Sequence, residues 1–229
     1  MQHRFVAPAP DEQPAAAALL HLQCGLPAEL RLVLARWWEE FHHAELLTLP
    51  GFLWARRGHL IAPDDHPPIA AMYGIATPAT ADQPRPPTFT LMPEELDGKV
   101  TFQRRILQRI SSPPGATEPV GTAFLELLRS ASDGDSPGLD AAGCVRQWPG
   151  VLAVSCWRSA VTTPDTSRQE VVHVRETELL LAELNADDRR VWELLARADH
   201  ELPGWDVSAY RQAYPTHGVL LPLAPEEVS

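Results

Sequence analysis

The chain has 229 residues, of which 45% are hydrophobic, and it carries a formal net charge of -11. The length suits one large or two small domains, and the apolar content is enough for a core. The negative charge argues against partners that attract basic proteins, namely nucleic acid and anionic membrane surfaces. No long apolar run or signal-type segment occurs, so we expect a soluble cytoplasmic protein that binds neither membrane nor nucleic acid.

Sequence motifs for metals and nucleotides are missing. The three cysteines, Cys24, Cys144 and Cys156, lie far apart, and no Cys/His spacing typical of a zinc site occurs. Glycine-rich dinucleotide loops, P-loops and the GxSxG and HExxH motifs are absent as well. We therefore expect no metal and no tightly bound cofactor.

The first half of the chain predicts a strand, a helix and two more strands. A flexible N-terminus (1–14) precedes an apolar strand over 16–25, and a helix follows from Pro27, which suits the first helical turn. A Pro-Gly turn at 50–51 leads into the next strand, and another strand covers 69–77. The proline-rich stretch 78–93 predicts an extended loop, which is either a lid or an insertion.

The second half predicts a similar series of elements. Strands are expected over 121–130, 148–160 and 169–178, with a loop or short helix before 147 and a helix after an N-cap at Asn185. The Pro-Gly pairs at 50–51 and 149–150 occupy the same place in each half, and the elements over 104–112 and 209–216 correspond as well. A repeat of about 100 residues indicates a duplicated domain.

These elements predict an α+β fold of two tandem ferredoxin-like (split βαβ) halves. The halves span 15–112 and 121–229, each in the order strand, helix, strand, strand, helix, strand, and a linker at 113–120 joins them. Helices cover only one face of such a sheet, so the other face needs a partner. Two halves stacked sheet to sheet would form one closed α+β barrel.

The segment 37–57 concentrates polar and aromatic chemistry at a helix–strand junction. It contains tryptophans, two histidines and two arginines around the Pro-Gly turn. In the helix, Trp37 shares a face with His42. In the strand, alternation places Phe52, Trp54 and Arg56 on one face and Leu53, Ala55 and Arg57 on the other.

This segment, together with Tyr73 in the next strand, resembles the EthD-like branch of the dimeric α+β barrel superfamily, a group that includes antibiotic-biosynthesis monooxygenases. The matching residues are Trp37, Trp38, Glu39, His42, Pro50, Gly51, Phe52, Arg56, Arg57 and Tyr73. The resemblance implies a small-molecule enzyme, and relatives include cofactor-independent oxygenases, cyclases, decarboxylases, isomerases and haem enzymes. The resemblance implies a barrel that two subunits normally close together, but a tandem chain can close it alone. A monomer and a homodimer are therefore both compatible with the sequence.

The second half keeps Trp148-Pro149-Gly150 but lacks the spaced Trp and His of the first. We therefore expect one chemically competent cavity, in the first half. There His42 is the favoured general base, since a free imidazole has a pKa of about 6.5, and His43 is its neighbour on another face. Alternatively, each histidine is structural.

Three further groups complete the predicted site. Only one of Arg56 and Arg57 can point into the barrel, and Arg57 is preferred as an oxyanion binder; a surface salt bridge with Glu39, Glu40 or Glu45 is the alternative. Tyr73 would donate its hydroxyl to a substrate oxygen, and Trp38 and Trp54 would wall a flat aromatic pocket or belong to an ordinary core.

His173 alternates with valines in a strand and is predicted to face a cavity. It would suit the axial position of a haem, but nothing else in the sequence supports a haem.

The leading functional hypothesis is a cofactor-independent oxygenase that tailors an aromatic, polyketide-like small molecule. His42 would deprotonate the substrate, and Arg57 and Tyr73 would hold the oxyanion. A redox-neutral cyclase, isomerase or decarboxylase in the same cavity is the first alternative. A non-catalytic binding or scaffolding protein is the second.

Overall fold

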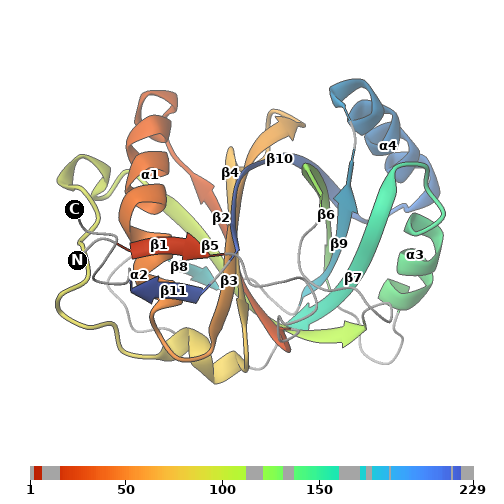
Figure 1. The fold of residues 1–229 in the computed structure, drawn as a ribbon. Helices are drawn as coiled ribbons and strands as arrows, with labels where there is room; N and C mark the ends of the chain where they lie inside the picture. The colour runs from red at the N-terminus through yellow and green to blue at the C-terminus, as the bar shows by residue number, and fades with distance from the viewer. Residues whose placement is uncertain are drawn as a thin grey trace.

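The computed structural model describes residues 3–6, 16–111, 121–130, 137–159, 171–173, 177–185, 187–217 and 219–222. These residues form an α+β fold built on a closed antiparallel barrel of eight strands with helices on its outside (Figure 1). The strand order is β2-β4-β3-β10-β6-β9-β7-β5, and β5 pairs back with β2 to close the barrel. The predicted α+β class and the closed barrel are confirmed.

The barrel strands are β2 (Ala18–Gly25), β3 (Phe52–Ala62), β4 (Ile69–Ile75), β5 (Thr101–Ser111), β6 (Ala123–Ser130), β7 (Val151–Ser159), β9 (Thr177–Leu184) and β10 (Asp206–His217). The helices are η1 (Ala28–Leu30), α1 (Arg31–Trp37), η2 (Trp38–His42), α2 (His43–Leu47), η3 (Pro78–Asp82), η4 (Glu94–Leu96), α3 (Pro137–Val145) and α4 (Asp188–Glu201). Three short strands lie outside the barrel: β1 (His3–Val6), β8 (Val171–His173) and β11 (Val219–Pro222). Strand β1 falls within the N-terminus that we expected to be flexible, and it pairs with β11.

The strands of the two halves follow the same order. The first half contributes β5-β2-β4-β3 and the second contributes β10-β6-β9-β7, and they meet where β3 pairs with β10 and β5 with β7. The Pro-Gly turns repeat too, because Gly51 and Gly150 have φ values of +86° and +89°. Each turn is closed by a 3.2 Å backbone hydrogen bond, from Phe52 to Leu49 and from Val151 to Trp148. Proline fixes the first turn position, and glycine tolerates the positive φ of the second.

The halves differ in what joins their third and fourth strands. The second half uses helix α4, whose N-cap is Asp187 rather than Asn185; its side chain accepts a 2.9 Å hydrogen bond from the Arg190 amide. The first half has no such helix, against the predicted order. Residues 76–100, which we call the covering segment, contain only η3, η4 and non-repetitive chain. Five prolines in this segment remove the amide donors that a helix needs: Pro78, Pro84, Pro86, Pro87 and Pro93.

The predicted strand over 169–178 is displaced in the structure. The barrel strand β9 covers Thr177–Leu184, whose eight residues are all buried. Its leucine-, alanine- and glutamate-rich sequence favours a helix by propensity. The segment is nevertheless a strand, because both of its faces are buried in the barrel wall. Within the predicted range, residues 171–173 form the short strand β8, which pairs in parallel with β5, and 177–178 begin β9. Residues 169–170 and 174–176 lie outside the described part of the chain.

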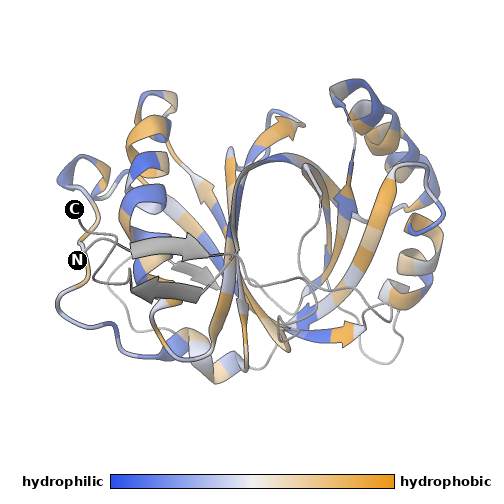
Figure 2. Cartoon of the chain, viewed as in Figure 1, coloured by the Kyte–Doolittle hydropathy of each residue, from blue (hydrophilic) through white to orange (hydrophobic). Residues whose placement is uncertain are grey.

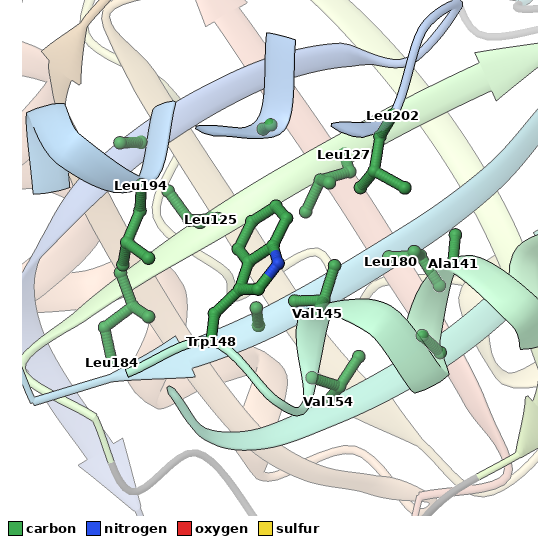
Figure 3. Packing of buried hydrophobic residues seen from close by; sticks show 14 of the residues in the cluster. Leu125, Leu127, Ala141, Val145, Trp148, Val154, Leu180, Leu184, Leu194 and Leu202 are labelled. Carbon is green, nitrogen blue, oxygen red and sulfur yellow. The ribbon is translucent and has the colours of Figure 1, made fainter. Parts of the chain in front are cut away.

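Alternation along the strands divides the buried side chains between the barrel interior and two outer layers under the helices. In Figure 2 the barrel strands carry much of the hydrophobic colour, whereas α4 alternates between hydrophobic and hydrophilic positions. The layer of the second half is apolar, and Figure 3 shows Trp148 surrounded there by aliphatic side chains from α3, α4 and the strands. The Trp148 indole donates a 3.0 Å hydrogen bond to Glu201.

The barrel interior combines large apolar side chains with a buried polar network. Glu126 accepts hydrogen bonds from Gln23 at 2.9 Å and pairs with His21 at 2.8 Å, and Arg105 donates to Gln23 at 2.9 Å. Arg56 pairs with Glu183 at 2.7 Å. These contacts link five strands of the barrel, so we assign the network to holding the strands in register.

A glycine makes room for the Trp54 side chain in the barrel interior. A Cβ built on Gly74 would lie 2.1 Å from the indole of Trp54, whereas one on Gly143 in α3 would meet nothing within 4 Å. We expect Gly74→Ala to lower the free energy of unfolding by about 1–3 kcal/mol, as overpacking does. Gly143→Ala should raise it by about 0.5–1 kcal/mol through helix propensity. Urea unfolding of both variants tests this, and an unchanged midpoint for Gly74→Ala would contradict the close packing.

None of the helices in the described ranges is long and apolar enough to cross a membrane.

Candidate functional site

The predicted site residues gather in the outer layer of the first half, between the α1–η2–α2 helix and strands β2, β3 and β4. We call this region the site layer. Trp38, His42, His43 and Tyr73 all lie there, with side chains exposed by 5% or less. In Figure 1 the helix stands beside these strands on the side of the barrel opposite α3 and α4. The layer therefore occupies in the first half the position that the Trp148 core occupies in the second.

A π-helical turn at Trp38–His42 orders the aromatic side chains of the helix. A π-turn brings residues five apart onto the same face, unlike the 3.6-residue period of an α-helix. The rings of Trp37 and His42 accordingly stack with centroids 4.4 Å apart, and those of Trp38 and His43 with centroids 6.0 Å apart. Such turns occur frequently at functional sites.

Tyr73 from β4 faces both histidines. Its ring centroid lies 5.3 Å from that of His43 and 6.3 Å from that of His42. Within the described residues, the Tyr73 hydroxyl, both ring nitrogens of His43 and the Trp38 indole nitrogen are buried without a hydrogen bond of normal geometry. Each such group costs about 1–3 kcal/mol relative to a paired one. The site layer therefore contains buried polar atoms without a hydrogen bond of normal geometry, whereas the Trp148 indole in the matching layer is paired with Glu201.

Burial keeps these groups neutral. It lowers the pKa of His43 to about 3, with a further contribution from the Arg57 charge. The pKa of His42 is lowered well below its usual value by burial, then by Arg85 and by His43. Burial also raises the pKa of Tyr73, against weaker lowering contributions from Arg85, Trp38 and Arg57. At neutral pH the layer thus presents free-base imidazoles beside an un-ionised phenol.

The two arginines of β3 face opposite ways, but the preferred choice of Arg57 for the barrel interior is wrong. Arg56 points inward, where its guanidinium lies 4.3 Å from the centre of the Phe124 ring. Arg57 points toward the helix, donates a 2.8 Å hydrogen bond to the Ala35 carbonyl and pairs with Glu39. The acidic side chain on the helix thus draws Arg57 to the edge of the site layer, where part of its charge is already neutralised.

Two other predicted residues do not join the cluster. Trp54 packs in the barrel interior, so it does not wall a pocket with Trp38 and Tyr73. A register shift between Phe52 and Trp54 puts Phe52 on the site-layer side instead, with its ring centroid 6.0 Å from that of Tyr73. The backbone of His173 pairs with that of Arg104, but the side chain of His173 lies outside the described residues.

The covering segment closes the outside of the site layer. Phe89, Met92 and Leu96 pack against its apolar residues. The amide and hydroxyl of Thr90 donate hydrogen bonds of 2.8 and 2.7 Å to one oxygen of Glu45 in α2. The segment therefore lies over the first half, as predicted for the loop at 78–93.

The fold is shared with solved structures of low sequence identity. An anthrone oxidase-like protein aligns over 97% of this chain and 99% of its own, with a TM-score of 0.57 and 11% identity. A candidate chlorite dismutase aligns over 88% of this chain and 96% of its own, with a TM-score of 0.50 and 11% identity. A candidate monooxygenase from Lactobacillus acidophilus aligns over 90% of this chain and 100% of its own, with a TM-score of 0.49 and 12% identity. The chain has the barrel fold of the anthrone oxidase-like protein and the candidate chlorite dismutase.

No protein-family model and no curated protein matches the sequence. The likeness to solved structures therefore concerns the fold, and the argument for a function depends on the site layer itself. Among the described residues, no group of three or more His, Cys, Asp and Glu side chains is placed to hold a metal ion.

Two features of the layer escape a reading of the sequence. Helical periodicity places Trp37 and His42 on one face, but it does not indicate the stacking of Trp38 on His43. That stacking depends on the π-turn, whereas periodicity analysis assumes an α-helix. Arg85, whose charge acts on His42 and Tyr73, comes from the covering segment rather than from a strand or helix. The signal for Arg85 was its position between prolines, which marks a stiff segment.

Proposed function

We propose that the site layer binds a flat aromatic molecule and that the protein is an oxygenase without a tightly bound cofactor. The observation that carries this proposal is that both ring nitrogens of His43 are buried without a partner inside an aromatic layer, beside the Tyr73 hydroxyl and the Trp38 indole nitrogen. A phenolic or carbonyl ligand would supply their missing hydrogen-bond partners and stack on the same rings. The barrel fold shared with an anthrone oxidase-like protein is compatible with this chemistry.

The proposed reaction starts with proton removal by an imidazole. A neutral His43 accepts a proton from a phenol or an activated methylene, and the new anion stabilises the imidazolium beside it, because an opposite charge within about 4–6 Å favours the charged form. The Tyr73 hydroxyl donates a hydrogen bond to the developing oxyanion. The electron-rich anion then reacts with O2: a methylene becomes a carbonyl, and one water is released.

We prefer His43 to His42 as the base. Both ring nitrogens of His43 lack a partner within the described residues, and its ring lies nearer to Tyr73 than the ring of His42 does. His42 stacks closely on Trp37 and remains the alternative. Arg57, engaged by Ala35 and Glu39, is proposed to act through its charge rather than as a direct ligand.

We also infer that the barrel arose by tandem duplication of a ferredoxin-like unit related to the EthD-like proteins. The common strand order and the two closed Pro-Gly turns support this. One chain closes the barrel, so closure does not require a dimer.

An oxygen-dependence assay with 1,8-dihydroxyanthrone tests the proposed function. We expect the protein to accelerate oxidation to the anthraquinone with one O2 consumed per substrate, and to give no turnover under argon. Heat-inactivated protein controls for the spontaneous reaction in air. Turnover of an aromatic substrate without O2 would indicate a redox-neutral enzyme instead, and saturable binding without any turnover would indicate a binding protein.

A further inference from the structure

The covering segment contains a stiff stretch that displays one arginine. Arg85 lies between Pro84 and the pair Pro86-Pro87. Proline fixes its own φ, and it also restricts the preceding residue to extended conformations. Residues 83–86 accordingly have no helical or strand structure. The backbone at Arg85 therefore loses little entropy when its side chain engages a ligand.

Anchors on both sides fix this stretch to the site layer. Before it, the Gln83 side chain donates a 3.0 Å hydrogen bond to the Pro50 carbonyl in the Pro-Gly turn. After it, Phe89 packs on the layer and Thr90 binds Glu45 through two hydrogen bonds. The position of Arg85 over the layer is thus set by contacts that do not involve its own side chain.

Arg85 connects solvent to the buried cluster. Its side chain is exposed, yet its charge acts on both His42 and Tyr73. In the described part of the chain no carboxylate forms an ion pair with Arg85, whereas Arg57 is paired with Glu39 and Arg104 with Asp82. No carboxylate is among the groups that shift the pKa values of His42, His43 or Tyr73. The exposed guanidinium of Arg85 on this anchored stretch is therefore available to pair with an anionic ligand.

We propose that Arg85 is a specificity-determining residue, which binds an ionised group of the aromatic substrate at the edge of the site layer. This inference rests on the proposed function, because it takes the layer as the substrate site. It narrows the substrate class of the proposed function to aromatic molecules that carry a carboxylate or an ionised phenol. The stiff covering segment positions the Arg85 guanidinium for that group. Guanidinium groups suit this task because they remain charged and offer paired donors.

A matched pair of probes tests the proposal by binding alone, without any need for turnover. The probes are 1-hydroxy-2-naphthoate, which is an anion at pH 7, and its neutral methyl ester; dissociation constants are measured by titration calorimetry. We expect the wild-type protein to prefer the carboxylate. Arg85→Gln should weaken carboxylate binding about tenfold, as expected for one charged hydrogen-bonding partner, and leave the ester unchanged.

Two controls separate charge from packing. Arg85→Lys should retain part of the preference, and Arg189→Gln, which removes an exposed arginine from α4 in the other half, should alter neither constant. The preference should also shrink when NaCl is raised from about 20 mM to about 500 mM, because salt screens an exposed charge.

An equal loss for both probes in Arg85→Gln, or no preference in the wild type, would overturn the proposal. A wild-type preference abolished in Arg85→Gln, but without oxidation of any substrate, would support Arg85 and reject the oxygenase.

Discussion

Replacing His43 by glutamine is expected to lower the turnover of 1,8-dihydroxyanthrone by about 10²–10⁴-fold, the usual effect of losing a general base. Glutamine keeps a polar side chain of similar size, so the packing against Trp38 and Tyr73 should be largely retained. The rate loss should appear in kcat rather than in KM, because the proton is transferred in the chemical step. Oxygen uptake at saturating substrate measures it.

His42→Gln is the matched control, since it changes the adjacent residue in the same helix. We expect it to lower turnover less than tenfold, because His42 would contribute stacking on Trp37 rather than proton transfer. Near-ultraviolet circular dichroism should show that both variants keep their aromatic packing. If His42→Gln has the larger effect, the base is the residue that the sequence first indicated; if neither variant loses turnover, the mechanism is wrong.

The elements predicted best are those fixed by local chemistry. The Pro-Gly pairs at 50–51 and 149–150 form equivalent turns, because proline and glycine constrain the backbone regardless of the rest of the fold. The apolar strand that ends at Gly25 is found as predicted, and Arg56 and Arg57 of β3 alternate as predicted. Local patterns of this kind are decided within a few residues, so a single sequence contains enough information for them. A register shift moves Phe52 to the face opposite Trp54, against the predicted alternation.

The features that escaped prediction depend on long-range contacts. Which of Arg56 and Arg57 enters the barrel depends on Glu183 and Glu39, and neither of these lies near them in the sequence. The polar network around Glu126 joins strands from both halves. Its local signal is the pair His21 and Gln23, two polar residues on the same face of an otherwise apolar strand. A periodicity argument assigns such residues to a face but not to a partner.

Lowering the pH from 7 to 5 is expected to reduce the free energy of unfolding by about 2 kcal/mol through His43 alone. The pKa of His43 is about 3 in the folded protein and near 6.5 when unfolded, so the unfolded chain binds the proton first. The stability that neutral His43 contributes is therefore complete above pH 6.5 and is lost as the pH falls toward 3, where the loss reaches about 4 kcal/mol. Buried His42 changes stability in the same direction, since its pKa is also lowered.

Urea unfolding of the wild type and of His43→Gln at pH 7 and pH 5 isolates this contribution. The variant should lose less stability between the two values, by about the 2 kcal/mol assigned to the imidazole. His66 provides a control of opposite sign. Burial lowers its pKa, but the hydrogen bonds with Asp65 and Asp206 outweigh this effect, so the pKa of His66 is raised above its ordinary value. Protonated His66 therefore stabilises the fold below pH 6.5, and His66→Gln should make the protein more sensitive to acid. Equal pH dependence in the wild type and His43→Gln would mean that this imidazole is hydrated, and the site layer would then lack the neutral base that the mechanism requires.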